Sequence, residues 1–321
     1  MLSRVADGFY WMSRYLERAE QQARVIDVYL SLTLDDPTDT VGHALLTSVL
    51  PEQDDDPESE DEAVPTDPQA GRVAPEYLSA VTESVVRARE NARQIREQIS
   101  SAMWEQLNSL YLTVGTAGIS HAQDPGGFMR STIDRAHLFH GVTQATLSHG
   151  EGWHYMELGR YLERAMTTAS MLQQYFSDHG VDGSHAQVTA SRADYGAGVG
   201  LLRACAALEA YCRHYTADIR PERLAEFLLL NAEFPRSTQF AADRIEDSLR
   251  AIARGLGRQA TGRPERFAGR LRAALNYGTV DEILEDDIVG YVEQLRRQCS
   301  QIHSALYQTY ITYPIETAIA R

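Results

Sequence analysis

The chain has 321 residues, of which 30 are Lys or Arg and 45 are Asp or Glu, so its formal net charge is −15. This charge excludes sequence-independent nucleic-acid binding, which needs a cationic surface for phosphates, and it disfavours docking on an anionic membrane. The composition is 43% hydrophobic and 23% charged, and the sequence has no apolar run of about 18 residues that could span a membrane.

The beginning of the chain and its cysteines both favour a cytoplasmic protein. Charged residues appear at Arg4 and Asp7, too early for the apolar core of a signal peptide. Three cysteines cannot make a disulfide framework, and they lack the Cys-x-x-Cys spacing of a metal site. Cys205 and Cys212 lie two turns apart in an apolar stretch, so we interpret them as core residues.

Apolar residues recur at helical spacing along most of the chain, and no segment alternates as a strand does. We therefore predict an all-α, multi-helix bundle. The predicted helices span about 3–34, 75–100, 102–121, 128–148, 151–178, 195–216, 221–231, 236–258, 263–276 and 281–312. Their boundaries follow from the turn sequence Asp124-Pro125-Gly126-Gly127 and from Pro221, Pro235 and Pro314.

Residues 51–70 differ from the rest of the chain in charge. They contain nine acidic residues, no basic residue and four prolines. Such a segment cannot bury enough apolar surface to offset its ordering entropy, and its charges repel one another. We predict a disordered acidic loop inserted between helices, with a regulatory acidic segment as the alternative.

The sequence RYLERA occurs twice, at 14–19 and again 146 residues later at 160–165. The flanking residues are aromatic or Met-rich before both copies and largely aliphatic after them. We infer a single domain over 1–321 with two pseudo-repeated halves, roughly 1–150 and 151–321, each opened by an RYLERA helix. A repeat of the remaining helices is not legible in the sequence.

The first RYLERA helix is apolar on two faces when its residues are placed at about 100° per residue. One face is apolar throughout and comprises Val5, Met12, Leu16, Ala19, Ala23, Ile26 and Leu30. The face that carries the Arg and Glu residues of the motif also carries Tyr10, Trp11, Val25, Val28 and Tyr29. A helix that is apolar on both sides is buried on both sides. The charged side chains are then partly desolvated, which is costly unless each is paired.

The charged residues of the two motifs have two interpretations. In the structural one, an inter-helix lattice of ion pairs fixes how the two RYLERA helices cross. In the functional one, the motif residues line a pocket for anions, with Arg14, Arg18, Arg160 and Arg164 as ligands and Glu17 and Glu163 orienting them. Guanidinium groups suit planar carboxylates and phosphates, so an anionic substrate or an acidic segment of a partner could bind there.

Four separated blocks carry a family resemblance. They are the opening MLSRVADGFYWMSRYLERAEQQAR, the stretch ARENARQIREQISSAMWEQLN at 88–108, GRYLERA at 159–165 and FLLLNAEFPRS at 227–237. In these blocks, and along the chain from its first residue to about Ile315, the sequence resembles the bacterial alpha-E family, a helical domain of unknown function.

The resemblance implies a partner. Members of the alpha-E family are typically encoded beside, or fused to, a circularly permuted ATP-grasp ligase, often with a transglutaminase-like protein nearby. ATP-grasp enzymes activate a carboxylate as an acyl phosphate and join it to an amine. This sequence has no phosphate-binding loop, because the glycines at 196–200 follow no predicted strand. The resemblance therefore implies that the ATP chemistry belongs to the partner.

The second block adds two candidate residues. Arg93 lies three residues after Glu90 and four before Glu97, so it can pair along its own helix. That arrangement is typical of a solvated charged face. In the alternative interpretation, Asn91 and Arg93 join the anion pocket.

The fourth block adds Asn231 and Arg236, which flank the Phe234-Pro235 break. Helix ends leave backbone groups without partners there. Asn231 suits a helix cap or a ligand contact, and Arg236 could begin the next helix facing the pocket.

Metal and cofactor sites find little support in the sequence. Glu151-x-x-His154 has the spacing of a di-iron carboxylate bundle, but it has no second copy. His137 and His140 lie one turn apart, and two ligands do not complete a site. We expect no metal and no cofactor in this chain.

Three functional hypotheses remain. The first is an accessory subunit of an ATP-grasp amide or peptide ligase system, which binds the ligase, a carboxylate-bearing substrate or both through the Arg/Glu-lined seam between the halves. The second is a stand-alone helical enzyme that acts on an amide-linked metabolite or peptide with Glu17 or Glu163 as acid/base, although adjacent arginines disfavour a protonated carboxyl group. The third is a purely structural adaptor. Whether the chain is an enzyme stays open.

Overall fold

The computed structural model describes residues 1–35, 40–49, 75–116, 124–179 and 192–312, and within these ranges the chain is helical without strands. The helices of the first half are α1 (Ser3–Asp35), α2 (Val41–Val49), α3 (Pro75–Gln94), η1 (Arg96–Gln98), α4 (Ser101–Thr116) and α6 (Pro125–Thr146). Those of the second half are α7 (Glu151–Asp178), α8 (Arg192–Ala204), α9 (Leu208–Tyr215), α10 (Pro221–Leu230), α11 (Thr238–Gly255), α12 (Arg263–Tyr277), α13 (Val280–Asp286), α14 (Ile288–Leu306) and the π-helix η2 (Tyr307–Ile311). The all-α prediction is confirmed.

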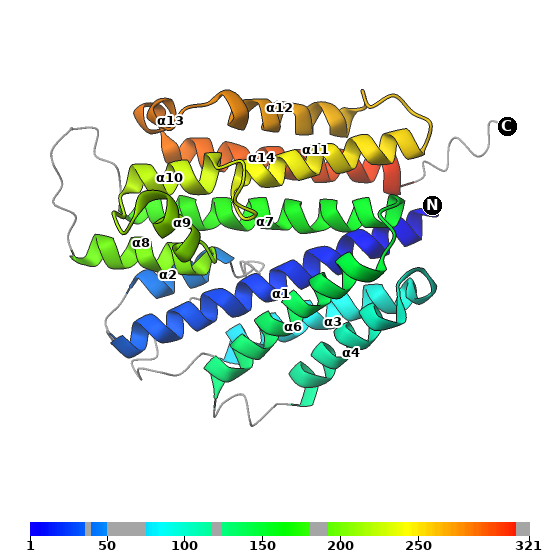
Figure 1. The fold of residues 1–321 in the computed structure, drawn as a ribbon, viewed down its shortest axis with the longest axis horizontal. Coiled ribbons are helices and arrows are strands. Elements are labelled where there is room, and N and C mark those ends of the chain that lie inside the picture. The colour runs from blue at the N-terminus through cyan, green and yellow to red at the C-terminus, as the bar shows by residue number, and fades with distance from the viewer. Residues whose placement is uncertain (36–39, 50–74, 117–123, 180–191, 313–321) are drawn as a thin grey trace, which may run out of the picture.

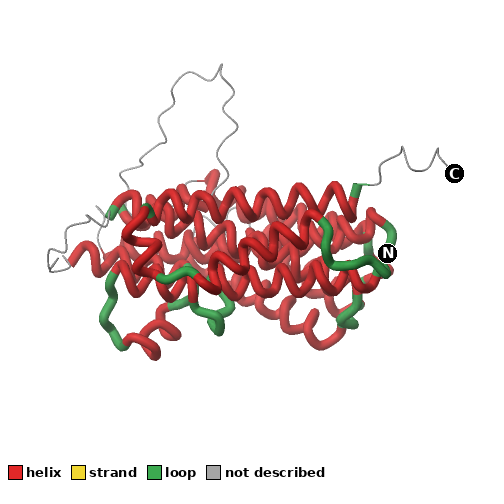
Figure 2. Tube along the Cα trace, turned by 90° about the horizontal axis from the view of Figure 1, so that it is seen from above, coloured by secondary structure: helices red, strands yellow, loops and turns green. Residues whose placement is uncertain are grey.

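The two RYLERA helices, α1 and α7, form the centre of the bundle. Helix α1 packs against α2, α3 and α6, whereas α7 packs against α11 and α14, and the two contact each other along their length. Figure 1 shows α3, α4 and α6 on one side of this pair and α11, α12 and α14 on the other. The view from above in Figure 2 shows the helices running along the long axis of the molecule. Each half thus packs around its own central helix, and the seam between the halves is the α1–α7 contact.

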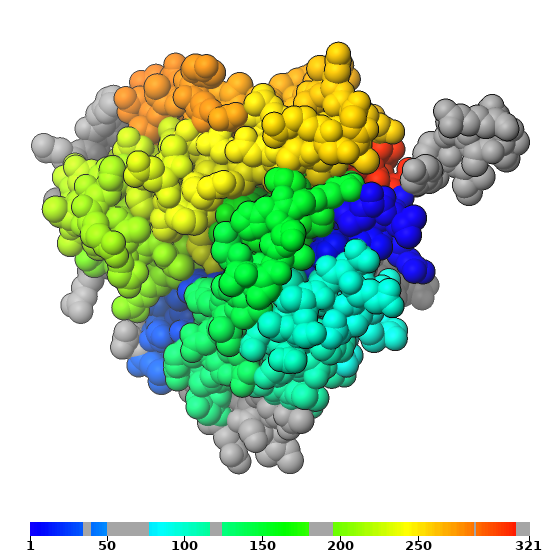
Figure 3. Space-filling model, turned by 45° about the vertical axis from the view of Figure 1, so that its right-hand side comes forward, coloured from blue at the N-terminus to red at the C-terminus, as the bar shows by residue number. Residues whose placement is uncertain are grey.

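The space-filling view in Figure 3 shows the same arrangement on one face. The green segment of α6 and α7 lies between the cyan α3–α4 segment and the yellow α11 segment. Helix α6 also packs against α1 and α4. It therefore covers part of the seam.

Three predicted boundaries differ from the structure. Helix α2 at 41–49 has no predicted counterpart. The helix predicted over 195–216 is two helices, α8 and α9, because Ala206 has a φ of 50°, in the left-handed region, and the backbone N–H of Ala207 bonds to the Leu202 carbonyl. The helix predicted over 281–312 is also divided, since a capping box of Thr279 and Glu282 begins α13 and Asp287 is extended between α13 and α14.

Other predictions have mixed outcomes. Cys205 is buried, which confirms its interpretation as a core residue, whereas Cys212, interpreted in the same way, is only half-buried. Cys299 is also buried. None of the described helices is long and apolar enough to cross a membrane. The predicted acidic loop at 51–70 lies outside the described residues. The pseudo-repeat of the two halves stays a prediction.

The central helices approach most closely at Gly159 of α7. A Cβ atom built on Gly159 would approach the Tyr10 carbonyl oxygen of α1 much more closely than van der Waals contact allows. It would also come within 3.3 Å of the Cγ atom of Arg14. Only glycine lets the two backbones come this close, so Gly159 sets the distance between the RYLERA helices.

Replacing Gly159 by Ala should lower the free energy of unfolding by about 2–3 kcal/mol, because the added methyl group overpacks the seam and the clashing atom is backbone. Gly141 of α6 is the matched control, since it is helical and exposed and a Cβ atom placed on it would have nothing within 4 Å. Replacing Gly141 by Ala should stabilise the protein by up to about 1 kcal/mol. Urea unfolding of both variants measures these effects. Equal stabilities would contradict the close approach.

Candidate functional site: a buried arginine–glutamate network

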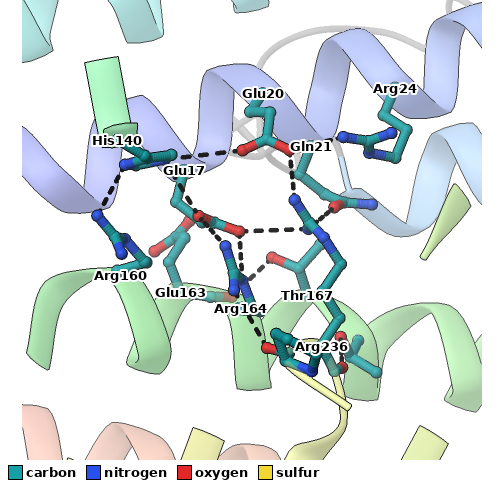
Figure 4. A network of polar contacts seen from close by, with 12 residues as sticks. Glu17, Glu20, Gln21, Arg24, His140, Arg160, Glu163, Arg164, Thr167 and Arg236 are labelled. Carbon is teal, nitrogen blue, oxygen red and sulfur yellow. Dashed lines mark hydrogen bonds and ion pairs between the residues drawn. The ribbon is translucent and has the colours of Figure 1, made fainter. Parts of the chain in front are cut away.

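The two RYLERA motifs pair with each other across the seam, as Figure 4 shows for Glu17, Glu163 and Arg164. The Nε atom of Arg14 donates to Oε2 of Glu163 at 2.7 Å, and Nε of Arg18 donates to Oε1 of the same carboxylate at 2.6 Å. In return, Arg164 donates to both oxygens of Glu17, at 2.7 and 2.8 Å. Each carboxylate of one helix is therefore held by guanidinium groups of the other.

These side chains are buried. The relative exposure is 5% for Arg14, 1% for Glu17, 5% for Glu163 and 9% for Arg164. Four of the six charged motif residues are therefore buried and meet across the seam, whereas the Arg18 side chain is 33% exposed and Arg160 pairs with Glu157 of its own helix. Apolar residues on both faces of α1 cause this burial, since Leu16 and Tyr10 are both fully enclosed although they lie on opposite faces of α1.

Arg236 joins the network from the segment between α10 and α11. Its guanidinium donates to Glu17 at 3.3 Å and to Gln21 at 2.9 Å, and it also bonds to Glu20. Local structure fixes its position, because the Ser237 hydroxyl caps α11 and Pro235 offers its carbonyl to Arg164. Arg236 is 8% exposed, so the prediction that it faces the motif residues is confirmed.

Asn231 acts as a cap in the same segment. Its Oδ1 atom accepts hydrogen bonds from the backbone N–H groups of Glu233 and Phe234, at 2.9 and 2.8 Å. The Ser237 hydroxyl bonds to its carbonyl oxygen. Of the two interpretations of Asn231, the structure favours the cap. Its contribution to the site is to shape the loop that carries Arg236.

Five residues of the network were not predicted from the sequence, four on the central helices and one, His140, on α6. Glu20 and Gln21 follow Glu17 by one turn of α1, and Arg24 donates to Glu20 at 2.7 Å. The i, i+3 spacing of Glu17 and Glu20 is a signal that could have identified Glu20. Glu157 of α7 pairs with Arg160 at 3.1 Å by the same i, i+3 rule.

Helix α6 supplies His140, which lies beside both α1 and α7. Its Nδ1 atom lies 2.8 Å from a terminal nitrogen of Arg160. Its Nε2 atom lies 3.8 Å from Oε2 of Glu17 and 3.8 Å from Oε2 of Glu20. The arginine–glutamate network thus consists of Arg14, Glu17, Arg18, Glu20, Gln21, Arg24, His140, Glu157, Arg160, Glu163, Arg164 and Arg236.

The carboxyl groups of Glu20 and Glu163 are ionised. Burial opposes ionisation of Glu163, but the charges of Arg14 and Arg18 outweigh it and lower the pKa of the carboxyl group. Burial likewise opposes ionisation of Glu20, and the charge of Arg236 and the hydrogen bond from His137 bring its pKa well below the usual range. A general acid needs a raised carboxyl pKa, so these two groups suit binding and positioning rather than proton donation.

His140 is neutral for the opposite reason. Burial disfavours its imidazolium form, and the nearby charge of Arg160 adds to this, so the pKa of His140 lies well below its ordinary value. Burial also lowers the pKa of Arg236, against the attraction of Glu20. The network therefore combines ionised carboxylates and guanidinium groups with one neutral imidazole.

The network reaches the surface at Arg18. The side chain of Arg18 is 33% exposed, and its guanidinium lies 5.4 Å from the centre of the Tyr15 ring. Arg87 of α3 lies 5.6 Å from the same ring and donates to the Tyr15 hydroxyl at 3.3 Å. Trp11 stacks on Tyr15 with ring centres 5.1 Å apart. Two arginines therefore lie beside the stacked rings of Trp11 and Tyr15 at the edge of the seam.

Two predicted residues lie outside the network. Arg93 is 61% exposed at its side chain and pairs with Glu90 on the same helix. Asn91 donates to the Arg87 carbonyl one turn earlier in α3. For these residues the structure matches the interpretation as a solvated helix face.

Of the two motifs considered for metals, Glu151/His154 lies apart from the network, whereas His140 belongs to it. Oε2 of Glu151 pairs with the N-terminal amino group at 2.9 Å, whereas His154 lines an open cavity of about 610 Å³ with Asp247 and Arg250. A second cavity, of about 190 Å³, lies between Arg263 and Gln308. No residue of the network lines either cavity.

Comparisons with known proteins identify the family of this chain. The family model of Alpha-E, described as a predicted alpha-helical domain with a conserved ER motif, matches residues 1–311, and the chain belongs to this family. The chain contains four Glu-Arg dipeptides, of which Glu17-Arg18 and Glu163-Arg164 lie in the network.

The curated relatives are much longer than this chain. Uncharacterized proteins of Mycobacterium bovis and Mycobacterium tuberculosis are 23% identical over 333 aligned positions. The alignment covers 94% of this chain and 35% of each relative, so the chain spans about a third of their length. The search of solved structures found no match.

Proposed function

We propose that this Alpha-E protein is a partner subunit of an ATP-grasp amide or peptide ligase system. It binds the ligase, a carboxylate-bearing substrate or both at the edge of the α1–α7 seam. The observation that carries the proposal is the pair of partly exposed arginines, Arg18 and Arg87, whose guanidinium groups both lie beside the Tyr15 ring.

The geometry of Arg18 favours binding of an anion. Its Nε atom is held by Glu163, which is itself held by Arg14 in the buried part of the network. An arginine fixed in this way loses little side-chain entropy when its remaining N–H groups bind a carboxylate. Arg87 is 55% exposed at its side chain and adds a second guanidinium beside the same ring. A carboxylate can accept charge-assisted hydrogen bonds from such guanidinium groups.

The long relatives also support a partner role. In the mycobacterial proteins the matched region is joined to about twice its own length of further sequence. A domain that occurs covalently joined to other sequence in one protein is a candidate for non-covalent association when it occurs without that sequence. The acyl phosphate chemistry of this system then belongs to the ligase.

The proposal is tested by co-expression with a circularly permuted ATP-grasp ligase of the same genome, followed by co-purification and mass spectrometry of the products. The double variant Arg18→Gln/Arg87→Gln should weaken the association, or raise the KM for a carboxylate substrate, at least tenfold, because it removes both exposed guanidinium groups. Arg297→Gln is the matched control, since Arg297 is 58% exposed at its side chain and pairs with Glu293 within α14.

The double variant should keep its helicity, because Glu163 stays paired with Arg14 and Arg87 lies at the surface. Its unfolding temperature should fall moderately, since Arg18 no longer pairs with the buried Glu163 carboxylate. A chain that neither co-purifies with the ligase nor changes its products contradicts the proposal. So does a double variant that binds and functions as well as Arg297→Gln.

A further inference from the structure

We propose that Glu17, Glu20 and His140 form a binding site for a divalent transition-metal ion such as Mn²⁺ or Zn²⁺. The site goes beyond the proposed function, because it lies inside the network and uses neither Arg18 nor Arg87. Figure 4 shows His140 pointing toward both carboxylates from α6. The sequence did not predict it, since α6 brings the imidazole to α1 from 120 residues further along the chain.

The three side chains offer one ligand atom each at a common gap. Oε2 of Glu17, Oε2 of Glu20 and Nε2 of His140 all lie within 4.8 Å of one another. The imidazole nitrogen is 3.8 Å from each of the two oxygens. These distances are too long for direct hydrogen bonds. An atom or ion bound between the three side chains would satisfy them.

Within the described part of the chain, two of these atoms have no hydrogen-bond partner. Glu20 is fully buried, and its Oε2 atom makes no hydrogen bond there. The Nε2 atom of His140 is likewise buried without a hydrogen bond to any described residue. A buried polar atom without a partner is costly, and two that face each other across a gap indicate a ligand between them. The other oxygen of Glu20 is already occupied by Arg24, Arg236 and His137.

The size of the gap suits a metal ion. For a triangle with two sides of 3.8 Å and a third of at most 4.8 Å, an ion equidistant from the corners lies about 2.0–2.5 Å from each. Bonds from Zn²⁺ to imidazole nitrogen or carboxylate oxygen are about 2.0–2.2 Å, which a small shift of the side chains provides. A water molecule needs about 2.8 Å to each partner and would lie out of the plane of the three atoms.

The donor set selects the class of metal. One imidazole and two carboxylates suit Mn²⁺, Fe²⁺ and Zn²⁺, whereas Mg²⁺ and Ca²⁺ prefer oxygen ligands alone. His140 is neutral, as a metal ligand must be. Because Arg160 donates to Nδ1, the proton of the free imidazole lies on Nε2. Metal binding moves that proton to Nδ1, which can then no longer accept from Arg160. The Arg160 guanidinium must turn away from the imidazole and keeps its ion pair with Glu157.

The surrounding arginines limit the affinity for a cation. Arg164 is paired with Glu17, and Arg24 and Arg236 are paired with Glu20. Their charges oppose that of a metal ion. Of the two arginines that pair with Glu20, Arg24 has the more exposed side chain, at 14%. Removing its charge should therefore strengthen metal binding, an effect that a merely structural role for Glu20 would not produce.

The experiment is calorimetric titration of the metal-free protein with MnCl₂ and ZnCl₂, followed by MgCl₂. We expect one ion per chain, with Mg²⁺ at least 100-fold weaker than Zn²⁺. His140→Ala should weaken Zn²⁺ binding at least 30-fold, and Arg24→Gln should strengthen it about threefold or more. His137→Ala is the matched control, because His137 lies one turn earlier in α6 and contacts the other oxygen of Glu20. The affinity of this variant for Zn²⁺ should stay within twofold of that of the unaltered protein. NMR of the imidazole nitrogens should show the change of tautomer at His140.

Absence of Mn²⁺ and Zn²⁺ binding at millimolar concentration would overturn the proposal and leave an ordered water as the occupant of the gap. Binding that His140→Ala leaves unchanged would overturn it as well, since the ion would then lie elsewhere. If His140→Ala does not fold, the Arg24→Gln titration decides, and unchanged or weaker binding in that variant contradicts the site.

Discussion

Replacing Glu17 by Gln should lower the free energy of unfolding by about 3–5 kcal/mol. The carboxylate of Glu17 is 1% exposed and is the partner of both Arg164 and Arg236, which are themselves 9% and 8% exposed. With Gln in its place the two guanidinium groups keep their charge in a buried site without a counterion. Removing one partner of a buried ion pair is much more costly than removing the whole pair. Urea unfolding followed by circular dichroism measures the effect.

Glu293→Gln is the matched control for that experiment. Glu293 also pairs with an arginine, Arg297, but its side chain is 50% exposed. Exposed pairs contribute little, so this change should alter the stability by less than about 0.5 kcal/mol. Similar losses in the two variants would show that burial of the network does not determine its energetics.

Acidification should destabilise the protein in two stages. In the first, His140 and His303 are responsible. Burial lowers the pKa of both, to about 4 for His303. Their stabilising contribution is therefore complete above the unfolded value of about 6.5 and is lost as the pH falls, since the unfolded chain binds protons that the folded chain excludes. We expect a loss of roughly 2 kcal/mol between pH 7 and pH 5, allowing for the partial exposure of His303.

In the second stage, Glu20 and Glu163 are responsible. Burial opposes their ionisation, but the neighbouring arginines lower the pKa of both. Their contribution is present above the unfolded value of about 4.3 and is lost as the pH falls toward the folded value. Urea unfolding at pH 8, 7, 6, 5 and 4 measures both stages. His303→Gln should reduce the slope between pH 7 and pH 5, and a stability that is flat over that range would contradict the assignment.

The fold class and half of the site were predictable because both depend on local sequence. Helical periodicity identifies α1 and α7, and the apolar residues on both faces of α1 imply that Arg14 and Glu17 are buried. The proline at 235 marks the break before α11, and Arg236 reaches the network from this segment, just before the Ser237 cap. Each of these inferences needs only the spacing of residues within one helix.

The remainder depends on contacts between distant segments. Nothing in the sequence near His140 indicates that α6 crosses both central helices, and this crossing brings the imidazole to Glu20. The break at Ala206 was missed because its left-handed backbone has no glycine or asparagine to mark it. Arg93 was a candidate because its spacing from Glu90 fits a surface pair and a pocket equally well, and only the packing of α3 separates the two.

A double-mutant cycle on Arg14 and Glu163 tests the central claim, that the two RYLERA turns form one buried network across the seam. Arg14→Met and Glu163→Leu should each lower the free energy of unfolding by about 3 kcal/mol or more. The loss in the double variant should be smaller than the sum of the two single losses by at least about 2 kcal/mol. Neither buried charge is then left without its partner, and Arg18 can turn to solvent once Glu163 is gone. Losses that simply add would show that Arg14 and Glu163 act independently and would contradict the network.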